Sequence, residues 1–296
     1  QAVYISLPNH LHAAWTIACA QAGKHILCEK PLASNRAEAM AMLDAVRRSE
    51  VFFMEAFMYR CHPQTAKIVQ LIQDGAIGKV RLIQGSFSYD MGENLDNIRQ
   101  QNEAAGGGIM DVGCYAMSLA RLVAGAAAGR EYSQPQQVKG VGFIGADSRV
   151  DEWATASLSF PCDVLANVTC GTRVAMDSTF RIWGSDGHIE IPNPWFPGND
   201  GSDATFALKR DGQDAEEISV AADSPLYTLE IDIVARAVES GNRQAPPPCM
   251  SWEDSLGNQA ALDEWRAEIG LIFDREKPTN FAPIAARPLQ KRAGNK

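Results

Sequence analysis

The stretch AVYISLPNHLHAAWTIACAQAGKHILCEKP, residues 2–31, decides the fold. Its short β-branched and aromatic start predicts a buried strand over residues 2–7. Apolar positions then recur at helical spacing over residues 11–22 and stop at Gly23, which is a candidate C-cap. Residues 24–28 form a second short apolar run. This order of strand, helix and strand predicts parallel pairing through a right-handed crossover.

The same unit is repeated downstream. Ser34 is a candidate N-cap for a helix over residues 35–48, and residues 51–58 form a third strand candidate. Two strand–helix units followed by a strand predict a doubly wound parallel sheet of an α/β protein. Such a sheet needs more than three strands to be stable, so we expect further strands before Gln1 and hence a truncated start.

Beyond residue 60, strands follow one another mostly without helical crossovers. Helices are expected at residues 63–73, 108–124, 226–240 and 251–274. Strands are expected at residues 79–89, 137–145, 150–160, 164–174, 178–183, 188–191 and 204–209. The segments Ser185-Asp186-Gly187 and Arg210-Asp211-Gly212 fit hairpin turns. The pattern predicts a second α/β domain with a large, mostly antiparallel open sheet.

The composition indicates a globular protein without a polyanionic partner. With 46% hydrophobic residues among 296, the chain has enough apolar side chains for two cores of ordinary domain size. The net charge of -9 argues against nucleic acid as a partner, and the basic cluster Arg287–Lys296 is interpreted as a solvated tail. Seven scattered cysteines are typical of free thiols in a reducing cytoplasm. We expect no membrane span and no signal peptide.

Two polar segments follow the first two predicted strands. Ligands of open parallel sheets bind at the carboxyl ends of the strands, where this chain has Asn9 and the run Glu29-Lys30-Pro31. Pro31 restricts Lys30 to extended geometry, which aims its side chain. A lysine there can hydrogen-bond a substrate hydroxyl and lower the pKa of a nearby acid. The alternative is a solvated lysine paired with Glu29.

A third polar segment opens the helix predicted at residues 108–124. The glycines at 106–108 permit close backbone approach, and Asp111 and Tyr115 are four residues apart, on one helix face. Tyrosine has a reference pKa near 10, so it needs a cation such as Lys30 to exchange a proton near neutral pH. The alternative places Asp111 at a favourable helix N-terminus and Tyr115 in the core.

Other candidates carry less information. Trp195 follows Pro192-Asn193-Pro194 and is interpreted either as an aromatic platform for a sugar ring or as a core anchor. The residues His10, His12 and His62 are too dispersed for a metal site, and no metal is predicted.

The motifs Glu29-Lys30-Pro31 and Asp111-x-Gly-x-Tyr115 together resemble the glucose-fructose oxidoreductase, inositol dehydrogenase and rhizopine-catabolism (Gfo/Idh/MocA) family. Similarity extends over nearly the whole chain. It includes LPNHLH at residues 7–12, EAFMYR at 55–60, GSDG at 184–187 and NPW at 193–195. The order and spacing of these motifs make the resemblance specific.

The resemblance implies an NAD(P)-dependent oxidoreductase acting on a sugar, polyol or dihydrodiol. Residues 1–59 are then the C-terminal portion of a Rossmann domain that binds NAD or NADP. Residues 60–296 are a domain for substrate binding and for assembly into a homodimer or homotetramer through its open sheet. Many members have His where this chain has Tyr115, which is similar to the subset of dihydrodiol and sugar dehydrogenases.

The resemblance also implies roles for individual residues. Lys30, Asp111 and Tyr115 occupy the family's catalytic positions. Our hypothesis is hydride transfer from a carbinol carbon to the nicotinamide, with Tyr115 accepting the proton, Lys30 polarising the same oxygen and Asp111 orienting Lys30 or the substrate. The residues that match positions lining the nicotinamide half of the family's site are Leu7, Asn9, His12, Glu29 and Lys30.

The family's glycine-rich turn and the residue that selects NAD or NADP lie upstream of these motifs, and we expect the spacing G-x-G-x-x-G to be absent from this chain. We therefore expect the chain to bind dinucleotide poorly or not at all. Two other functions stay open: a non-catalytic regulator that binds dinucleotide or sugar, and a glycoside-cleaving relative that uses NAD transiently. Loops at residues 90–105 and 192–203 are expected to shape the pocket.

Overall fold

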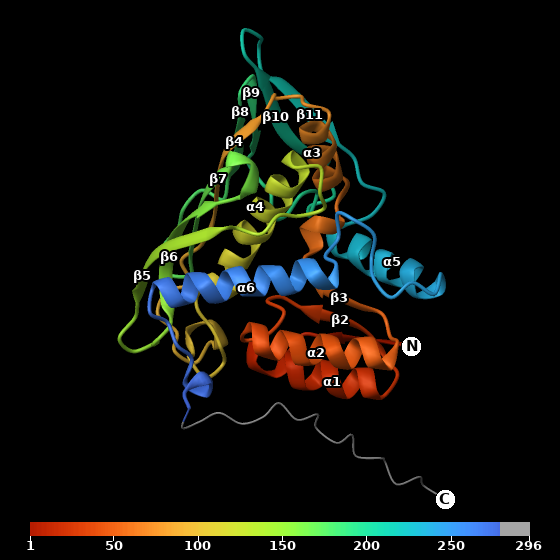
Figure 1. Cartoon of the computed structure of the whole chain (residues 1–296), viewed down its shortest axis with the longest axis vertical. Coiled ribbons are helices and arrows are strands. Elements are labelled where there is room, and N and C mark those ends of the chain that lie inside the picture. The colour runs from red at the N-terminus through yellow and green to blue at the C-terminus, as the bar shows by residue number, and fades with distance from the viewer. Residues whose placement is uncertain (279–296) are drawn as a thin grey trace, which may run out of the picture.

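The computed structural model describes residues 1–278 and contains two β-sheets (Figure 1). One has three parallel strands in the order β1-β2-β3, and the other has eight strands in the order β11-β10-β9-β8-β4-β7-β6-β5. The predicted α/β class, with a partial doubly wound sheet followed by a large, mostly antiparallel one, is confirmed. The basic cluster at residues 287–296 lies outside the described residues.

The parallel sheet and its helices follow the predicted order. The strands are β1 (Ala2–Ile5), β2 (His25–Glu29) and β3 (Phe53–Ala56), and the crossover helices are α1 (His12–Gln21) and α2 (Arg36–Ser49). Gly23 has a φ of 66° directly after α1, as its predicted C-cap role requires. The N-cap of α2 is Asn35 and not Ser34, because the Asn35 side chain accepts the Glu38 amide.

The eight-stranded sheet forms most of the remaining chain. Its strands are β4 (Val80–Ser88), β5 (Gln137–Ile144), β6 (Asp151–Ser159), β7 (Leu165–Gly171), β8 (Phe180–Gly184), β9 (Gly187–Ile191), β10 (Ala204–Arg210) and β11 (Glu216–Val220). Both predicted hairpins are present, joining β8 to β9 and β10 to β11. Strand β4 pairs parallel with β7 and antiparallel with β8, so it connects two antiparallel halves.

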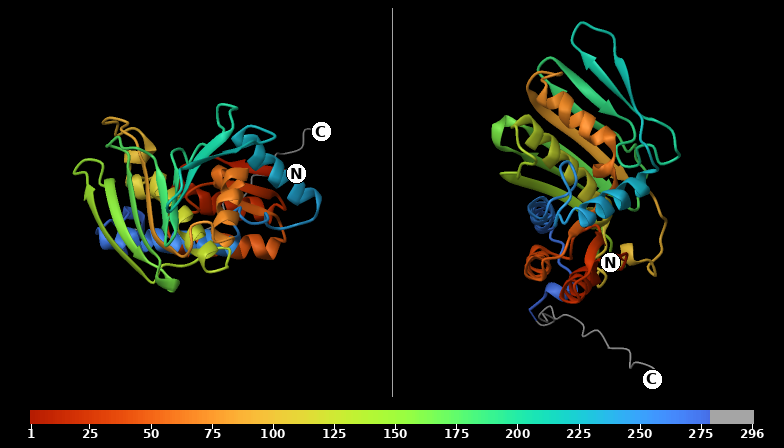
Figure 2. Two further views of the ribbon diagram at one scale, coloured as in Figure 1. Left: turned by 90° about the horizontal axis from the view of Figure 1, so that it is seen from above. Right: turned by 90° about the vertical axis from the view of Figure 1, so that its right-hand side faces the viewer.

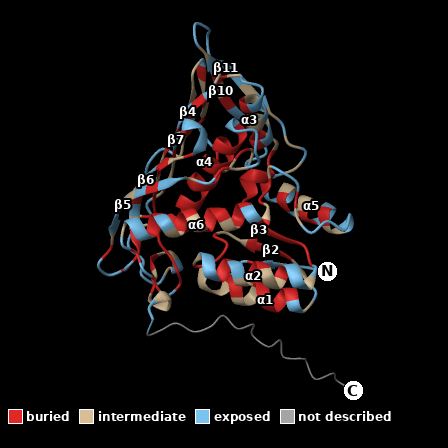
Figure 3. Cartoon of the chain, viewed as in Figure 1, coloured by how far each residue is buried: buried red, intermediate tan, exposed pale blue. Residues whose placement is uncertain are grey.

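Helices α3 (Pro63–Gln73) and α4 (Cys114–Ala127) lie against one face of this sheet (Figure 2). The stretch Ile109–Ala127 is long and apolar enough to cross a membrane by length and composition, but residues 109–126 are all buried in the fold. Figure 3 shows α4 as a buried segment among the strands. This stretch is therefore the core helix of the larger unit.

Helices α5 (Leu226–Glu239) and α6 (Trp252–Glu268) return from the larger unit to the parallel sheet. The Trp252 indole packs in the core of the smaller unit and donates a hydrogen bond to the Phe53 carbonyl, at 3.0 Å. On the other face of the parallel sheet, Val234 of α5 packs near Leu27 of β2. Helices α5 and α6 thus complete the core around the parallel sheet, although they follow the larger sheet in the sequence. The predicted domain boundary after residue 59 therefore stays a prediction.

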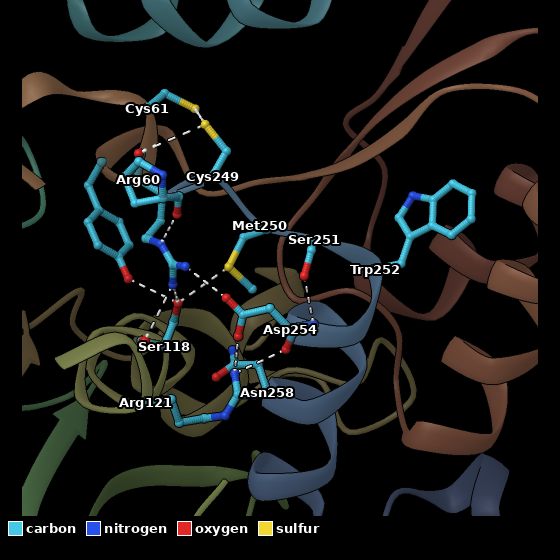
Figure 4. Close-up of polar contacts among 12 residues, drawn as sticks. Arg60, Cys61, Ser118, Arg121, Cys249, Met250, Ser251, Trp252, Asp254 and Asn258 are labelled. Atoms are coloured by element: carbon cyan, nitrogen blue, oxygen red, sulfur yellow. Dashed lines mark hydrogen bonds and ion pairs between the residues drawn. The ribbon is translucent and has the colours of Figure 1, made fainter. Parts of the chain in front are cut away.

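A cluster of buried ion pairs connects the parallel-sheet unit to the unit of the eight-stranded sheet (Figure 4). Asp254 of α6 accepts from Arg60 at 2.7 Å and from Arg121 of α4 at 2.6 Å. Arg60 also donates to the Ser118 hydroxyl of α4, at 2.9 Å. Arg60 lies in the short helix Met58–Cys61 directly after β3, so the cluster fixes the carboxyl end of that strand.

Candidate active site

A cavity of about 570 Å³ opens where the carboxyl ends of the parallel strands meet the larger unit. Its walls come from the strand ends, the start of the α4 region, the loop before residue 106, the segment after β9, and α5. The lining residues are Ser6, Leu7, Asn9, Glu29, Lys30, Ala56, Met58, Phe87, Tyr89, Ile98, Arg99, Gly106, Asp111, Val112, Tyr115, Phe196, Tyr227 and Glu230. This is the position at which open α/β sheets bind ligands.

Lys30 is held inside this cavity by Asp111. Its Nζ atom donates to the Asp111 carboxylate at 3.1 Å and to the Asp111 backbone carbonyl at 2.6 Å. Only 13% of the Lys30 side chain is exposed, so the alternative of a solvated lysine paired with Glu29 is wrong. Burial lowers the pKa of the ammonium, but the charge and hydrogen bond of Asp111 together with the nearby Cys114 and Glu29 outweigh this effect, and the net pKa is raised. Lys30 is therefore charged at neutral pH.

Asp111 has three polar partners through its carboxylate. One oxygen receives Lys30, while the other receives the Tyr89 hydroxyl and forms an ion pair with Arg99 Nε at 3.0 Å. Burial raises the pKa of Asp111, but Lys30 and Arg99 reverse the shift, so the net pKa is lowered. Asp111 lies in a π-helical turn, Ile109–Gly113, that precedes α4. The carboxylate is thus an ionised anchor for two cations.

Tyr115 lies next to Lys30 and packs against several aromatic rings. The Lys30 ammonium is 5.1 Å from the centre of the Tyr115 ring, and the Tyr115 hydroxyl is 3.5 Å from Met58 Sδ. Burial raises the pKa of Tyr115 well above its usual value. The nearby Cys114, Glu29 and Asp111 add to this rise, so the Tyr115 phenol keeps its proton in the free pocket. Tyr115 fits both predicted roles, since it packs in the core and also lines the cavity.

The three glycines before this turn permit close approach, as predicted. A Cβ atom at Gly106 would lie 2.5 Å from the Ile98 carbonyl oxygen, in the loop that carries Arg99. Gly107 has a φ of 104°, which favours glycine, and its Cα faces the Asp151 carboxylate. Asp151 in turn accepts the Ile109 amide at 2.6 Å. The glycines therefore let the Arg99 loop and the helix start lie side by side.

Four of the five predicted cofactor residues line the cavity, and His12 does not. Leu7, Asn9, Glu29 and Lys30 are at its wall. His12 is fully buried, and its two ring nitrogens face the Pro31 and Leu7 carbonyls at 2.9 and 2.7 Å. The prediction that His12 lines the pocket is therefore wrong. The ring instead holds together the two loops that follow β1 and β2.

The interpretation of Trp195 as a sugar platform is also wrong. Trp195 is fully buried, and its indole donates to the Ser86 carbonyl at 3.0 Å. Its ring is stacked on Phe87 with the centroids 5.5 Å apart, below the cavity wall. The alternative of a core anchor is confirmed. The aromatic side chains that reach the cavity from this region are Phe87 and Phe196.

Several cavity residues were not predicted individually. Tyr89 and Arg99 come from a strand end and a loop, and only their contact with Asp111 reveals them. The loop at residues 90–105 was expected to shape the pocket, and Arg99 belongs to it. Tyr227 and Glu230 lie three apart on α5, a spacing that places both on one helix face.

The spacing G-x-G-x-x-G does occur in the chain, at Gly140–Gly145, and corrects the expectation of its absence. These glycines belong to β5 and the turn after it. A Cβ atom at Gly140 would lie 2.7 Å from Trp265 Cδ1, and one at Gly142 would lie 3.1 Å from Ile269 Cδ1. The motif therefore lets α6 pack on the sheet. It is not a pyrophosphate turn, since β5 continues into the antiparallel strand β6.

A ligand cavity at parallel strand ends, with an ion-paired lysine above a buried tyrosine, defines the class of Rossmann-type oxidoreductases. Residues 1–57 match the oxidoreductase family with an NAD-binding Rossmann fold, and residues 65–190 match the Gfo/Idh/MocA C-terminal domain. The chain belongs to the Gfo/Idh/MocA family of NAD(P)-dependent oxidoreductases.

Several relatives support this assignment. The chain is 35% identical to D-xylose 1-dehydrogenase (NADP(+)) 2 of Haloferax volcanii, over 88% of this chain and 76% of that protein. It is 27% identical to mouse (Mus musculus) trans-1,2-dihydrobenzene-1,2-diol dehydrogenase, over 94% of this chain and 80% of that protein. A 3-ketoreductase from Actinomadura kijaniata, crystallised with NADP and TDP-benzene, has a TM-score of 0.79 at 28% identity, with 91% of this chain and 78% of that chain covered.

The cavity fits the reactive half of the family's cofactor. Its wall at the strand ends carries an apolar side chain, Leu7, an amide, Asn9, and a carboxylate, Glu29, around an open space. Asn9 is fixed by a hydrogen bond to the Ala105 carbonyl at 2.8 Å, and Glu29 accepts the Tyr4 hydroxyl. A planar, partly polar ring matches this mixture of apolar and hydrogen-bonding groups. These residues would hold the nicotinamide end of NAD or NADP.

Proposed function

We propose that this enzyme transfers a hydride between NAD or NADP and a secondary alcohol or carbonyl of a sugar, polyol or dihydrodiol. One observation carries the proposal: the Lys30–Asp111 ion pair, 3.1 Å long, lies over the Tyr115 ring in the cavity at the strand ends. A volume of about 570 Å³ suits a small molecule beside a nicotinamide ring. Relatives named for D-xylose and for dihydrobenzenediol support this range of substrates.

Each of the three residues has a distinct role. When bound, the dinucleotide supplies the ring that accepts or gives the hydride. Tyr115 exchanges the proton of the substrate oxygen, and Lys30 hydrogen-bonds the same oxygen. Asp111 contacts Lys30 and Arg99 and therefore positions the two cations.

The protonation state of Tyr115 in the free pocket makes the reaction sensitive to pH. Tyr115 has a raised pKa and keeps its proton, so it is ready to donate to an oxygen that becomes an alcohol. Alcohol oxidation requires Tyr115 to accept a proton, which higher pH favours. We therefore expect the rate of alcohol oxidation to rise with pH.

The experiment is a turnover screen with the purified product of the complete gene, because residues 1–296 by themselves are expected to bind dinucleotide poorly. NADP⁺ and NAD⁺ are offered with D-xylose, other aldoses, cyclitols and trans-dihydrobenzenediol, and NAD(P)H formation is followed by absorbance. We expect at least one of these alcohols to give net NAD(P)H. Tight cofactor binding without turnover on any of them would instead support a non-catalytic regulator. Cleavage of glycosides without net NAD(P)H would support a glycoside-cleaving enzyme.

We further propose that the enzyme is a homodimer or homotetramer and that it acts in the cytoplasm. Apolar side chains on the outer face of β5 and β6 support assembly: Val141 is 69% exposed, and Phe143 stacks on Trp153 with their ring centres 4.3 Å apart. Large exposed apolar patches mark protein interfaces. All seven cysteines are free thiols, which supports a reducing compartment. Cell fractionation tests the location.

A further inference from the structure

Glu230 is a buried carboxyl group without a partner at the wall of the cavity. It belongs to α5, and only 4% of the residue is exposed. Its Oε1 atom is completely buried and has no hydrogen-bond partner. Within residues 1–278 we find no hydrogen bond or ion pair to either of its oxygens. Buried polar groups are nearly always paired, so a carboxyl of this kind beside a ligand cavity points to a partner supplied by the ligand.

Burial, more than the charges around it, favours the protonated form of Glu230. Burial, together with the nearby Glu29 of β2 and Cys249 of the segment before α6, raises the pKa of Glu230 to about 8. Its other titratable neighbours are the phenols Tyr4 of β1 and Tyr227 of α5 and the thiol Cys61 of the short helix after β3. The two cations of the cavity are paired with Asp111 and do not neutralise Glu230.

A neutral carboxylic acid has one hydrogen-bond donor and further acceptor capacity, which is the same combination that a substrate hydroxyl offers. A cationic ligand group would need the ionised acid, and an apolar group would leave the carboxyl unpaired. Tyr227 lies one turn earlier on α5 and also lines the cavity, so it adds a phenolic hydroxyl to the same wall.

We propose that Glu230 is a specificity-determining residue that hydrogen-bonds a substrate hydroxyl remote from the carbon that is oxidised. This inference rests on the proposed function and narrows its substrates to molecules with at least two hydroxyl groups. Enzymes discriminate strongly against analogues that lack a bound hydroxyl, because a buried polar group is then left unpaired. Glu230 thereby separates polyols and sugars from simple secondary alcohols.

The test compares E230L and E230Q with the wild-type enzyme, using D-xylose, its monodeoxy analogues and NADP⁺. If D-xylose is not turned over, the most active polyol of the screen and its monodeoxy analogues replace it. For the wild type, removal of one remote hydroxyl lowers kcat/KM by about 10- to 100-fold. For E230L, kcat/KM on the parent sugar falls by a similar factor, and the parent sugar and that deoxy analogue then have similar kcat/KM. The KM of E230L for NADP⁺ is unchanged. E239L, an exposed position on the same helix, is the control and behaves as the wild type.

The pH dependence supplies a second readout that does not depend on the leucine variant folding. The amide of E230Q both donates and accepts but cannot ionise, so its KM for the sugar is constant from pH 7 to 9, whereas the wild-type KM rises as Glu230 ionises.

The outcomes separate this inference from the proposed function. Equal losses on every analogue, an effect on the KM for NADP⁺ alone, or a pH profile shared by E230Q and the wild type would each overturn the role of Glu230. In those cases wild-type turnover of the sugar still supports the oxidoreductase function. A wild-type enzyme that is inactive on the whole screen would contradict that function.

Discussion

At the residue scale, Asp111 is the centre of the site, because both cations of the cavity are paired with it. Lys30 approaches one carboxylate oxygen and Arg99 the other, and Tyr89 donates to the second oxygen. Without this carboxylate the two positive charges would lack their shared counter-ion. The position of the Lys30 ammonium over Tyr115 therefore depends on Asp111.

We expect D111N to lower kcat/KM by about 10²- to 10³-fold, the size of effect typical of a group that supports acid–base chemistry. Asp111 raises the pKa of Lys30, so loss of the charge lowers that pKa. The alkaline limit of the profile of kcat/KM against pH then shifts to lower pH. An unchanged profile would show that Asp111 does not control Lys30. D232N, on a partly exposed position of α5, is the matched control.

Single residues show which parts of the site the sequence can predict. Lys30, Asp111 and Tyr115 carry a motif, and their meeting follows from strand ends and helix spacing. Burial, in contrast, depends on distant segments. Trp195 and His12 have side chains suited to ligand contact, yet both are fully buried against backbone carbonyls. Glu230 has no local signal, because its lack of a partner exists only in the folded chain.

At the element scale, periodicity predicts most helices and strands, since the alternation of apolar and polar side chains records which face is buried. Strand β11 was not predicted, because it lies at the sheet edge and begins with two exposed glutamates, Glu216 and Glu217, which hide its apolar positions. The beginnings and ends of helices and strands depend on specific side-chain contacts, which secondary-structure propensities do not predict. The cap of α2 is Asn35, although the neighbouring Ser34 has an equally suitable side chain.

The buried ion pairs of Asp254 with Arg60 and Arg121 link helix α6 to the end of β3 and to α4, and we expect this link to stabilise the fold. We expect D254N to lower the free energy of unfolding by about 3–5 kcal/mol, because two buried guanidinium groups lose their shared counter-ion. Chemical denaturation measures this change. E253Q, the adjacent position on α6, is the control: its ion pair with Arg47 is more than half exposed and contributes less than about 1 kcal/mol. Equal stability of both variants would contradict the link.

At the scale of the whole molecule, the large sheet has two different faces. One face packs against α3 and α4 to form the main core, and the other carries exposed apolar side chains on β5 and β6. Figure 2 shows that helices do not cover this outer face. A second copy of the chain is the partner that the family resemblance implies.

We expect V141D to weaken self-association, because a buried carboxylate at an apolar interface is costly to desolvate. Light scattering of the wild-type protein should give a dimer or tetramer mass, and V141D should shift the distribution towards the monomer. A strand position on the same sheet but outside the apolar patch, as in S219D, should leave the mass unchanged. A monomeric wild-type protein would contradict the proposed assembly.

The measurement that tests the central claim most directly is kcat/KM for K30M, Y115F and the double variant, with NADP⁺ and the best alcohol of the screen. If Lys30 and Tyr115 act on one substrate oxygen, each single variant loses about 10²- to 10⁴-fold in turnover. The kcat/KM of the double variant is then only slightly below that of the less active single variant, because the effects of residues that act as a unit are non-additive. Near-wild-type turnover in either single variant, with the protein folded, would contradict the account.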